Sequence, residues 1–339
     1  MPSSFAPPAP ARLLVLAAFA AVYLIWGSTY LGIRLAIESM PPLLMAGTRS
    51  VFAGAILYAY TRGIRREPAA TTRGWGHAVV VGAGLLLVGN GGVTLAEQYV
   101  PSGLASLLVA TVPMWLAVLG WLSGLSARPR PLTWLALGLG LAGVALLAGG
   151  PAVDAAGAGT APGHHTLGVG LLLTASLTWA AASLYSRKYL IAPTVLVSVA
   201  MQMLCGGALL CIAGLLRGEA HGLDVAHITA RSWGAWAYLV GFGSLIGFSA
   251  YAWLLRNVEP ALVGTYGFVN PVVAVGLGWG FADEKLTPAM GGGAALIVVA
   301  VALVVLGARP AATTATARKT AAKPADDANA APPVNAVAE

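Results

Sequence analysis

The sequence predicts an all-α integral membrane protein with ten transmembrane helices arranged as two inverted five-helix repeats. Three observations support this fold class: the composition, the apolar runs and an internal repeat. Of the 339 residues, 58% are hydrophobic and 9% are charged. Soluble domains carry about 25% charged residues, so this chain lacks the charge that a water-exposed surface requires.

Ten apolar runs are long enough to cross a bilayer as helices, because a hydrocarbon core about 30 Å thick requires roughly 20 residues. The runs cover residues 13–33, 43–61, 75–95, 102–123, 132–150, 168–190, 195–216, 233–255, 261–281 and 289–308. We expect a short N-terminal segment at 1–12 and a loop at 151–167. Residues 309–339 are rich in Ala, Pro and Thr and are expected to be disordered.

The distribution of the 19 Lys and Arg residues predicts the orientation. With the N-terminus in the cytoplasm, the outer ends carry only Arg34, Arg217, Arg231 and Lys285, and Arg49 lies within the second helix. The other basic residues then lie in cytoplasmic segments. We therefore expect both termini to be cytoplasmic.

The chain contains an internal repeat. "RGWGHAVVVGAGLLLVG" at 73–89 matches "RSWGAWAYLVGFGSLIG" at 231–247 with an offset of 158 residues, and Pro113 matches Pro271 at the same offset. Earlier in the chain the offset is 153, where Trp26 matches Trp179. Five helices per copy is an odd number, so the second copy, 168–308, enters the membrane from the side opposite to the first, 13–150. Inverted repeats of this kind are typical of secondary transporters.

No motif indicates an enzyme, a metal site or a bound cofactor. His164 and His165 lie in the predicted loop without an acidic or Cys partner at ligand spacing. Cys205 and Cys211 lie six residues apart on opposed faces of one helix, which suits neither a disulfide nor a metal. A phosphate-binding G-x-x-x-x-G-K-[ST] motif is absent. The net charge of +7 is explained by cytoplasmic anchoring without a nucleic-acid partner.

Two prolines are predicted to break helices near the middle of the membrane. Pro113 and Pro271 lie about halfway along the fourth and ninth apolar runs. Proline removes a backbone donor, which lipid tolerates only where protein or a cavity satisfies the freed groups. Matching interruptions in the two halves are the best pointer to a transport site. A kink that serves packing alone is the alternative.

Polar side chains gather at a similar depth and are candidates for substrate binding. They are Asn90, Thr111, Tyr251, Tyr266 and Asn270. A second role, hydrogen bonding between helices, is open for each of them and is favoured for Gln202.

Arg49 is a candidate for gating or charge pairing. It lies about six residues from the outer end of the second helix, where a charge costs about 2.5–3.5 kcal/mol on insertion scales. Glu97 and Glu284, at the outer ends of the third and ninth helices, are its candidate partners. Snorkelling to the outer headgroups is the alternative for Arg49.

Three long strings resemble the EamA-type branch of the drug/metabolite transporter superfamily, and within it the YedA-type exporters of bacterial inner membranes. The strings are "IWGSTYLGIRLAIESMPPLLMAGTR", "VGNGGVTLAEQYVPSGLASLLVATVP" and "RNVEPALVGTYGFVNPVVAVGLGW". The resemblance covers residues 13–308. It implies ten helices in two EamA repeats and export of small metabolites, amino acids or drugs. The motif positions that carry over are Trp26-Gly27-Ser28, Arg49, Pro113, Asn270-Pro271 and Glu284.

We therefore expect a secondary transporter that exports a small organic solute by alternating access through a midplane cavity. Trp26 and Ser28 join the candidate binding residues, and helices 1, 3, 4, 6, 8 and 9 should line the cavity. A passive facilitator with the same fold is the main alternative, so proton coupling stays open. The expected partners are the substrate and membrane lipids, and the sequence suits a monomer or a homodimer.

Overall fold

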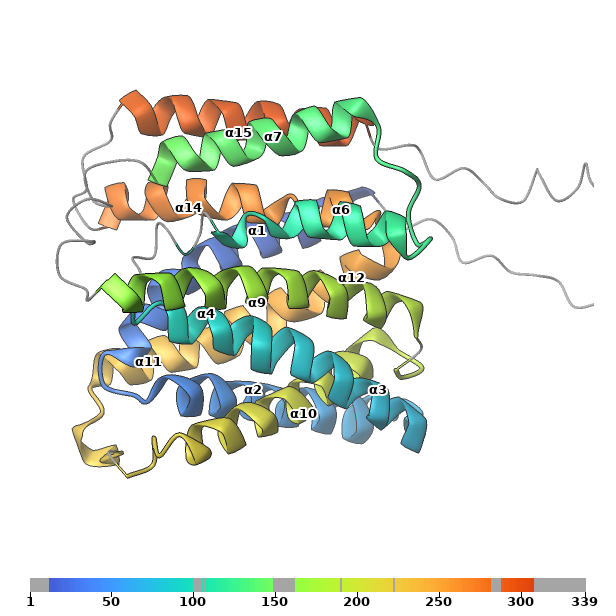
Figure 1. Ribbon diagram of the computed structural model, residues 1–339. Helices are drawn as coiled ribbons and strands as arrows, with labels where there is room; N and C mark the ends of the chain where they lie inside the picture. Colours follow the sequence, from blue (N-terminus) through green and yellow to red (C-terminus); the bar gives the residue numbers. More distant parts are fainter. Residues whose placement is uncertain are drawn as a thin grey trace, which may run out of the picture. The chain divides into compact units, whose positions relative to one another are not determined.

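The computed structural model of the protein describes residues 12–99, 105, 108–148, 162–189, 191–221, 223–281 and 288–307. All regular secondary structure in these ranges is helical (Figure 1). Glu284 and the C-terminal segment 309–339 lie outside the described residues, as does most of the predicted N-terminal segment.

Six helices of the described ranges are long and apolar enough to span a bilayer. They are α1 (Arg12–Ile37); α2 (Pro42–Ala59) continued by the π-helical η1 (Tyr60–Ile64); α3 (Thr72–Gly82), η2 (Ala83–Asn90) and α4 (Gly91–Ala96) in one rod; α9 (Pro162–Lys188); α10 (Val195–Leu216); and α11 (Ala230–Tyr238), η4 (Leu239–Phe248) and α12 (Ser249–Asn257) in a second rod. The shorter helices are α6 (Val112–Leu122), α7 (Pro131–Ala148), η3 (Val225–His227), α13 (Pro260–Val263), α14 (Tyr266–Phe281) and α15 (Pro288–Gly307). The predicted all-α membrane class is thereby confirmed.

Several of these helices begin at residues whose chemistry favours a start. The hydroxyl oxygens of Thr71, Thr194 and Thr229 accept hydrogen bonds from backbone N–H groups three residues on, at the first turns of α3, α10 and α11. An N-terminal Ser or Thr satisfies one of the free amides of the first turn in this way. Pro42 fits the start of α2 because the first helical position needs no amide donor.

Two pairs of helices join the halves of the chain. Helix α2 packs along α10, and α7 packs along α15 (Figure 1). In the first pair the backbones meet at Gly54 and Gly207, which match in the repeat. A Cβ at Gly54 would lie 2.9 Å from the Leu204 amide nitrogen, and one at Gly207 would lie 2.7 Å from that of Val51. Small residues at both positions permit this close approach.

Other helical segments form two groups, each built from the corresponding helices of the two repeats. Helix α1 packs against the α11–η4–α12 rod and α14, whereas α9 packs against the α3–η2–α4 rod and α6. The first helix of each repeat therefore lies against the third and fourth helices of the other repeat. Exchanging the repeats converts one group into the other, as the sequence repeat predicts.

The third helix of each repeat widens into a π-helix at the matching place. At the repeat offset of 158, η2 (Ala83–Asn90) corresponds to the last eight residues of η4 (Leu239–Phe248). π-Helical turns are rare and occur frequently at functional sites. The sequence repeat thus extends to a local irregularity of the backbone that the helical periodicity did not predict.

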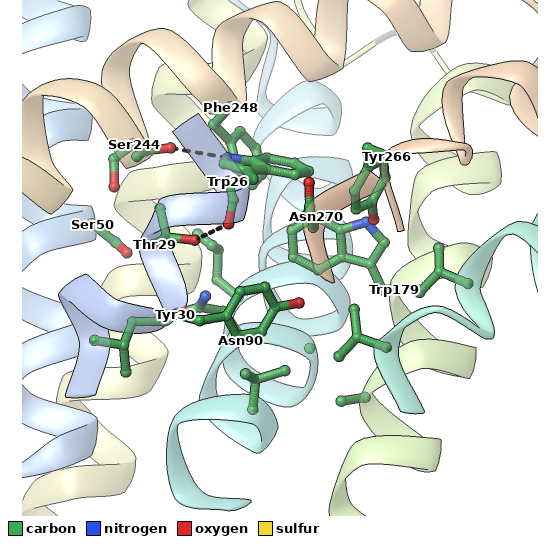
Figure 2. Close-up of a pocket in the computed structure, with 18 of the residues that line it drawn as sticks. Trp26, Thr29, Tyr30, Ser50, Asn90, Trp179, Ser244, Phe248, Tyr266 and Asn270 are labelled. Carbon is green, nitrogen blue, oxygen red and sulfur yellow. Dashed lines mark hydrogen bonds between the residues drawn. The ribbon is translucent and has the colours of Figure 1, made fainter. Parts of the chain in front are cut away.

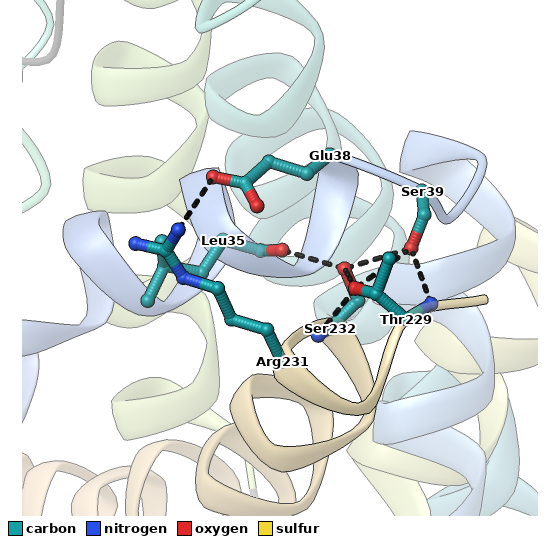
Figure 3. Close-up of polar contacts among 6 residues, drawn as sticks. All are labelled: Leu35, Glu38, Ser39, Thr229, Arg231 and Ser232. Carbon is teal, nitrogen blue, oxygen red and sulfur yellow. Dashed lines mark hydrogen bonds and ion pairs between the residues drawn. The ribbon is translucent and has the colours of Figure 1, made fainter.

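A polar cluster fixes the end of α1 to the start of α11 (Figure 3). The Ser232 hydroxyl donates to the Leu35 carbonyl oxygen at 2.8 Å, and the Ser39 hydroxyl donates to Ser232 at 2.8 Å. The Thr229 amide donates to the Ser39 hydroxyl at 3.1 Å. Arg231 and Glu38 form an exposed ion pair at 3.9 Å beside the cluster, and pairs of this kind contribute little to stability.

Two predictions about local structure need correction. Helix α14 runs without interruption through Pro271, so this proline does not break the helix. The break lies almost two turns earlier, at Gly264–Thr265 between α13 and α14, where the Thr265 hydroxyl donates to the Leu262 carbonyl oxygen at 2.6 Å. Helix α9 begins at Pro162, so His164 and His165 are helical and do not lie in a loop.

Pro113 does coincide with a helix start, at the second residue of α6. A Cβ at Gly264 would lie 3.0 Å from Pro113 Cα, so the interruptions of the fourth and ninth helices pack against each other. Neither Pro113 nor Pro271 lines the cavity described next. For Pro113 these contacts favour the packing interpretation.

Candidate functional site

A cavity lies between the two helix groups, with about 800 Å³ of space between atoms, its open part included (Figure 2). Its walls come from α1, η2, α4, α9, η4 and α14, together with Val109 and Val112 at the start of the fourth helix. These are the six helices that were expected to line a cavity. Arg49 and Ser50 of α2 and Met203 of α10 also contribute, which the sequence analysis did not predict.

Aromatic rings form one part of the lining. The rings of Trp26 and Trp179, which match in the repeat, meet edge to face with centroids 5.6 Å apart. Tyr266 lies against Trp26 at 5.0 Å, also edge to face. Edge-to-face contacts of this kind stabilise aromatic pairs by about 0.5–1.5 kcal/mol beyond area burial. Figure 2 shows Trp26, Trp179, Tyr266 and Phe248 grouped in this part of the cavity.

Each tryptophan is seated on a glycine of the opposite repeat. A Cβ at Gly247 in η4 would lie 2.6 Å from Trp26 Nε1, and a Cβ at Gly89 in η2 would lie 2.8 Å from Trp179 Cε3. The Trp26 indole N–H donates to the Gly243 carbonyl oxygen at 3.2 Å. The glycines at the matching π-helical positions therefore create the space for the matching rings.

Buried polar side chains form another part of the lining. Arg49 is 5% exposed, and its Nη2 donates to Asn90 Oδ1 at 2.7 Å. Among the described residues, Arg49 Nε and Asn270 Oδ1 are buried and have no hydrogen-bond partner. Buried polar atoms in proteins are normally hydrogen-bonded to protein, water or ligand, so these two atoms are free to bind water or a molecule that enters the cavity.

Glu97 lies just beyond the apolar span Thr72–Ala96, at the end of α4. No ion pair within 4.0 Å joins it to Arg49 among the described residues. Both carboxyl oxygens are buried without a hydrogen-bond partner in the described part of the chain. Burial raises the pKa of Glu97 to about 8, against the opposing effect of the positive charges of Arg34 and Arg49.

The other candidate residues lie outside the lining. The Ser28 hydroxyl donates to the Ile25 carbonyl oxygen at 2.7 Å and contacts the Tyr238 hydroxyl at 2.5 Å. The Thr111 hydroxyl donates to the Leu108 carbonyl oxygen at 2.6 Å. Tyr251 is 1% exposed, and its hydroxyl contacts Ser183 at 2.6 Å and accepts from Trp179 Nε1 at 3.1 Å. Tyr251 therefore holds the Trp179 ring in place by a hydrogen bond without lining the cavity itself.

Several lining residues were missed by the sequence analysis, among them Tyr30, Trp179, Ser244 and Phe248. A signal existed for Trp179, because it is the repeat partner of Trp26. Tyr30 lies four residues after Trp26, which places both on one face of α1. Nothing in the sequence distinguishes Ser244 and Phe248 from other residues of that helix.

Comparison with known proteins identifies the family. Residues 13–149 and 166–306 each match the EamA-like transporter family. The chain is 41% identical over 290 residues to the uncharacterized inner membrane transporter YedA of Escherichia coli (strain K12), covering 85% of this chain and 89% of YedA. It is 27% identical to the uncharacterized transporter YvbV of Bacillus subtilis (strain 168), with 86% and 91% covered.

A more distant relative and a solved structure agree with this assignment. A probable amino-acid metabolite efflux pump of Escherichia coli (strain K12) is 26% identical, with 85% of this chain and 93% of the pump covered. A crystal structure with 22% sequence identity superposes with a TM-score of 0.69, covering 87% of this chain and 98% of that one, and shows that the fold is shared. The predicted resemblance is confirmed: the chain is a membrane transporter and belongs to the EamA-like transporter family.

Proposed function

We propose that the protein is a secondary transporter of the bacterial inner membrane that exports small organic solutes through the cavity by alternating access. The observation that carries this proposal is the cavity itself, which lies between two helix groups related by the repeat. Ligand sites of transporters built from inverted repeats typically lie between the repeats near the bilayer midplane. Ten spans in two inverted repeats, with both termini cytoplasmic, complete the proposal.

The depth of the lining residues suggests which side the cavity faces. With a cytoplasmic N-terminus, α1 runs outward, and its lining residues extend from Trp26 near the middle to Ile33, four residues before the helix ends. Arg49 lies seven residues after the outer start of α2 at Pro42. The cavity then occupies the outer half of the membrane, and the aromatic rings close its inner end. Rocking of the two groups would reverse this arrangement.

The lipid-facing surface fits the same proposal. Leu24, Phe52 and Val298 are 61%, 52% and 65% exposed. Large apolar side chains at this exposure are unfavourable in water, whereas lipid tails solvate them.

Counterflow in proteoliposomes tests the function. The purified full chain is reconstituted and loaded with a labelled amino acid, nucleoside, sugar or cationic dye, with and without a pH gradient. Exchange that a pH gradient drives supports a coupled exporter. Flux of the same size without a gradient favours the passive facilitator. If no compound of any class moves in either direction, the proposed function is wrong.

A reporter fusion tests the orientation. A reporter attached at residue 157 should behave as extracytoplasmic, and one at the C-terminus should behave as cytoplasmic. The reverse pattern would contradict the assignment of both termini to the cytoplasm, and with it the location of the cavity in the outer half of the membrane.

A further inference from the structure

Arg49 carries a positive charge that the described part of the protein does not neutralise. The residue is 5% exposed and lines the cavity. A guanidinium group has five N–H donors in a planar fork. One of them reaches Asn90 Oδ1, a neutral acceptor, and Nε has no partner among the described residues. Buried charges in proteins are normally paired, because an unpaired charge is strongly disfavoured.

The surroundings of Arg49 do not supply the missing anion. No Asp or Glu occurs among the described residues that line the cavity. Glu97, nearby at the end of α4, is influenced by the positive charges of both Arg34 and Arg49. Arg34 is exposed to solvent, and Glu97 forms no ion pair within 4.0 Å of Arg49 among the described residues. The local field therefore attracts an anion.

Another part of the lining is mainly aromatic and also contains Asn270. Trp26, Trp179, Tyr266 and Phe248 present ring surfaces to the cavity, and Figure 2 shows these rings grouped together. A ligand that satisfies both parts needs an anionic end and an apolar body. The guanidinium fork matches a carboxylate in two parallel hydrogen bonds.

We propose that Arg49 is the carboxylate-binding residue of the cavity, and that the substrates are small organic carboxylates whose apolar bodies contact the tryptophan and tyrosine rings. The proposal rests on the proposed transport function and names the substrate class within it. Asn90 orients the fork by accepting from Nη2, which leaves Nε and the other donors for the ligand. Organic cations are excluded, because they would bring a second positive charge beside Arg49.

Matched pairs of ligands test this proposal on the wild-type protein. The pairs are phenylacetate with phenylacetamide, 3-phenylpropionate with 3-phenylpropanamide, and isovalerate with isovaleramide, each titrated calorimetrically into the purified full chain in detergent. The members of a pair share their shape and differ in charge. We expect each acid to bind about tenfold to hundredfold more tightly than its amide, because hydrogen bonds between charged groups are worth about 1.5–3 kcal/mol.

Variants assign the effect to Arg49. Arg49→Gln should remove the preference for the acid, and Arg49→Lys should keep part of it, because an ammonium group supplies charge without the fork. Arg217→Gln is the matched control, because it deletes the same charge at an exposed position outside the lining. It should leave the preference intact.

The outcomes separate this inference from the proposed function. If no acid binds more tightly than its amide, or if Arg49→Gln keeps the preference, the inference is overturned, while flux of neutral or cationic compounds in proteoliposomes would still support a transporter. If nothing binds and nothing moves, both fail. Should Arg49→Gln not fold, the acid–amide comparison in the wild-type protein still decides the question.

Discussion

Replacing Gly247 with Ala tests whether Trp26 depends on the bare backbone of η4. A Cβ at this position would lie 2.6 Å from Trp26 Nε1 and 2.9 Å from Cδ1, whereas ordinary contacts begin at 3.4 Å. The indole ring must therefore move by about 1 Å in a densely packed interior. Such a shift also weakens the hydrogen bond from Nε1 to the Gly243 carbonyl oxygen.

The expected magnitude follows from opposing terms. Overpacking costs about 1–3 kcal/mol, and loss of the hydrogen bond adds about 0.5–1.5 kcal/mol. The better helix propensity of Ala returns at most about 1 kcal/mol. We expect Gly247→Ala to lower the free energy of unfolding by about 0.5–3.5 kcal/mol. The assay is thermal unfolding of the purified protein in detergent.

The repeat supplies matched controls. A Cβ at Gly234, in the same rod, meets nothing within 4 Å, and the same holds for its repeat partner Gly76. Gly234→Ala should therefore leave the unfolding temperature unchanged or raise it, because only helix propensity changes. Gly89→Ala, which meets Trp179, should behave like Gly247→Ala, with Gly76→Ala as its control. The reasoning is refuted if Gly247→Ala is as stable as Gly234→Ala.

Two further predictions concern the carboxyl groups of Glu219 and Glu97. Glu219 accepts hydrogen bonds from the backbone amides of Leu43 at 3.0 Å and Leu44 at 2.9 Å; Glu219→Gln should therefore destabilise the start of α2 by about 1 kcal/mol, read as a lower unfolding temperature, and an unchanged one would contradict the capping role. The pKa of Glu97 is raised to about 8 by burial, and the described titratable groups that act on it are Tyr30, Arg34 and Arg49. Its carboxyl group is therefore neutral below that pH and competes for Arg49 above it, so carboxylate binding should weaken as the pH rises through 8; Glu97→Gln should abolish this dependence, and a variant that keeps it would disprove the competition.

The fold class could be predicted from the sequence because it depends on the overall composition and on the length of the apolar runs, which do not depend on the position of any single side chain. The structure adds that matching residues of the repeat also meet across the molecule, as Gly54 does beside α10 and Gly207 beside α2, which the sequence alone did not predict. The helix interruption predicted at Pro271 was misplaced by almost two turns, because α14 continues through the proline and the break lies where the Thr265 hydroxyl donates to the Leu262 carbonyl oxygen. Proline alone therefore does not locate a break.

The candidate site was predicted in part. Trp26, Asn90, Tyr266 and Asn270 lie in the cavity lining, and so does Arg49. Ser28 and Thr111 donate to carbonyl oxygens of their own helical segments instead, three residues back. This local bond is common for hydroxyl side chains and leaves no trace in the order of residues. Depth in the membrane can be counted from the sequence, but the direction of a side chain around a widened helix cannot.

The matching tryptophans connect the two halves in a way that bears on the proposed transport cycle. Trp26 belongs to the first repeat and lies on Gly247 of the second, while Trp179 belongs to the second and lies on Gly89 of the first. The two rings also contact each other at 5.6 Å. Because interiors are close-packed, a shift of either third helix must displace a ring of the other repeat. Each of these tryptophan–glycine contacts lies within one helix group and fixes its helices to each other. The contact between the Trp26 and Trp179 rings lies between the two groups, so this contact must change if the groups rock as proposed.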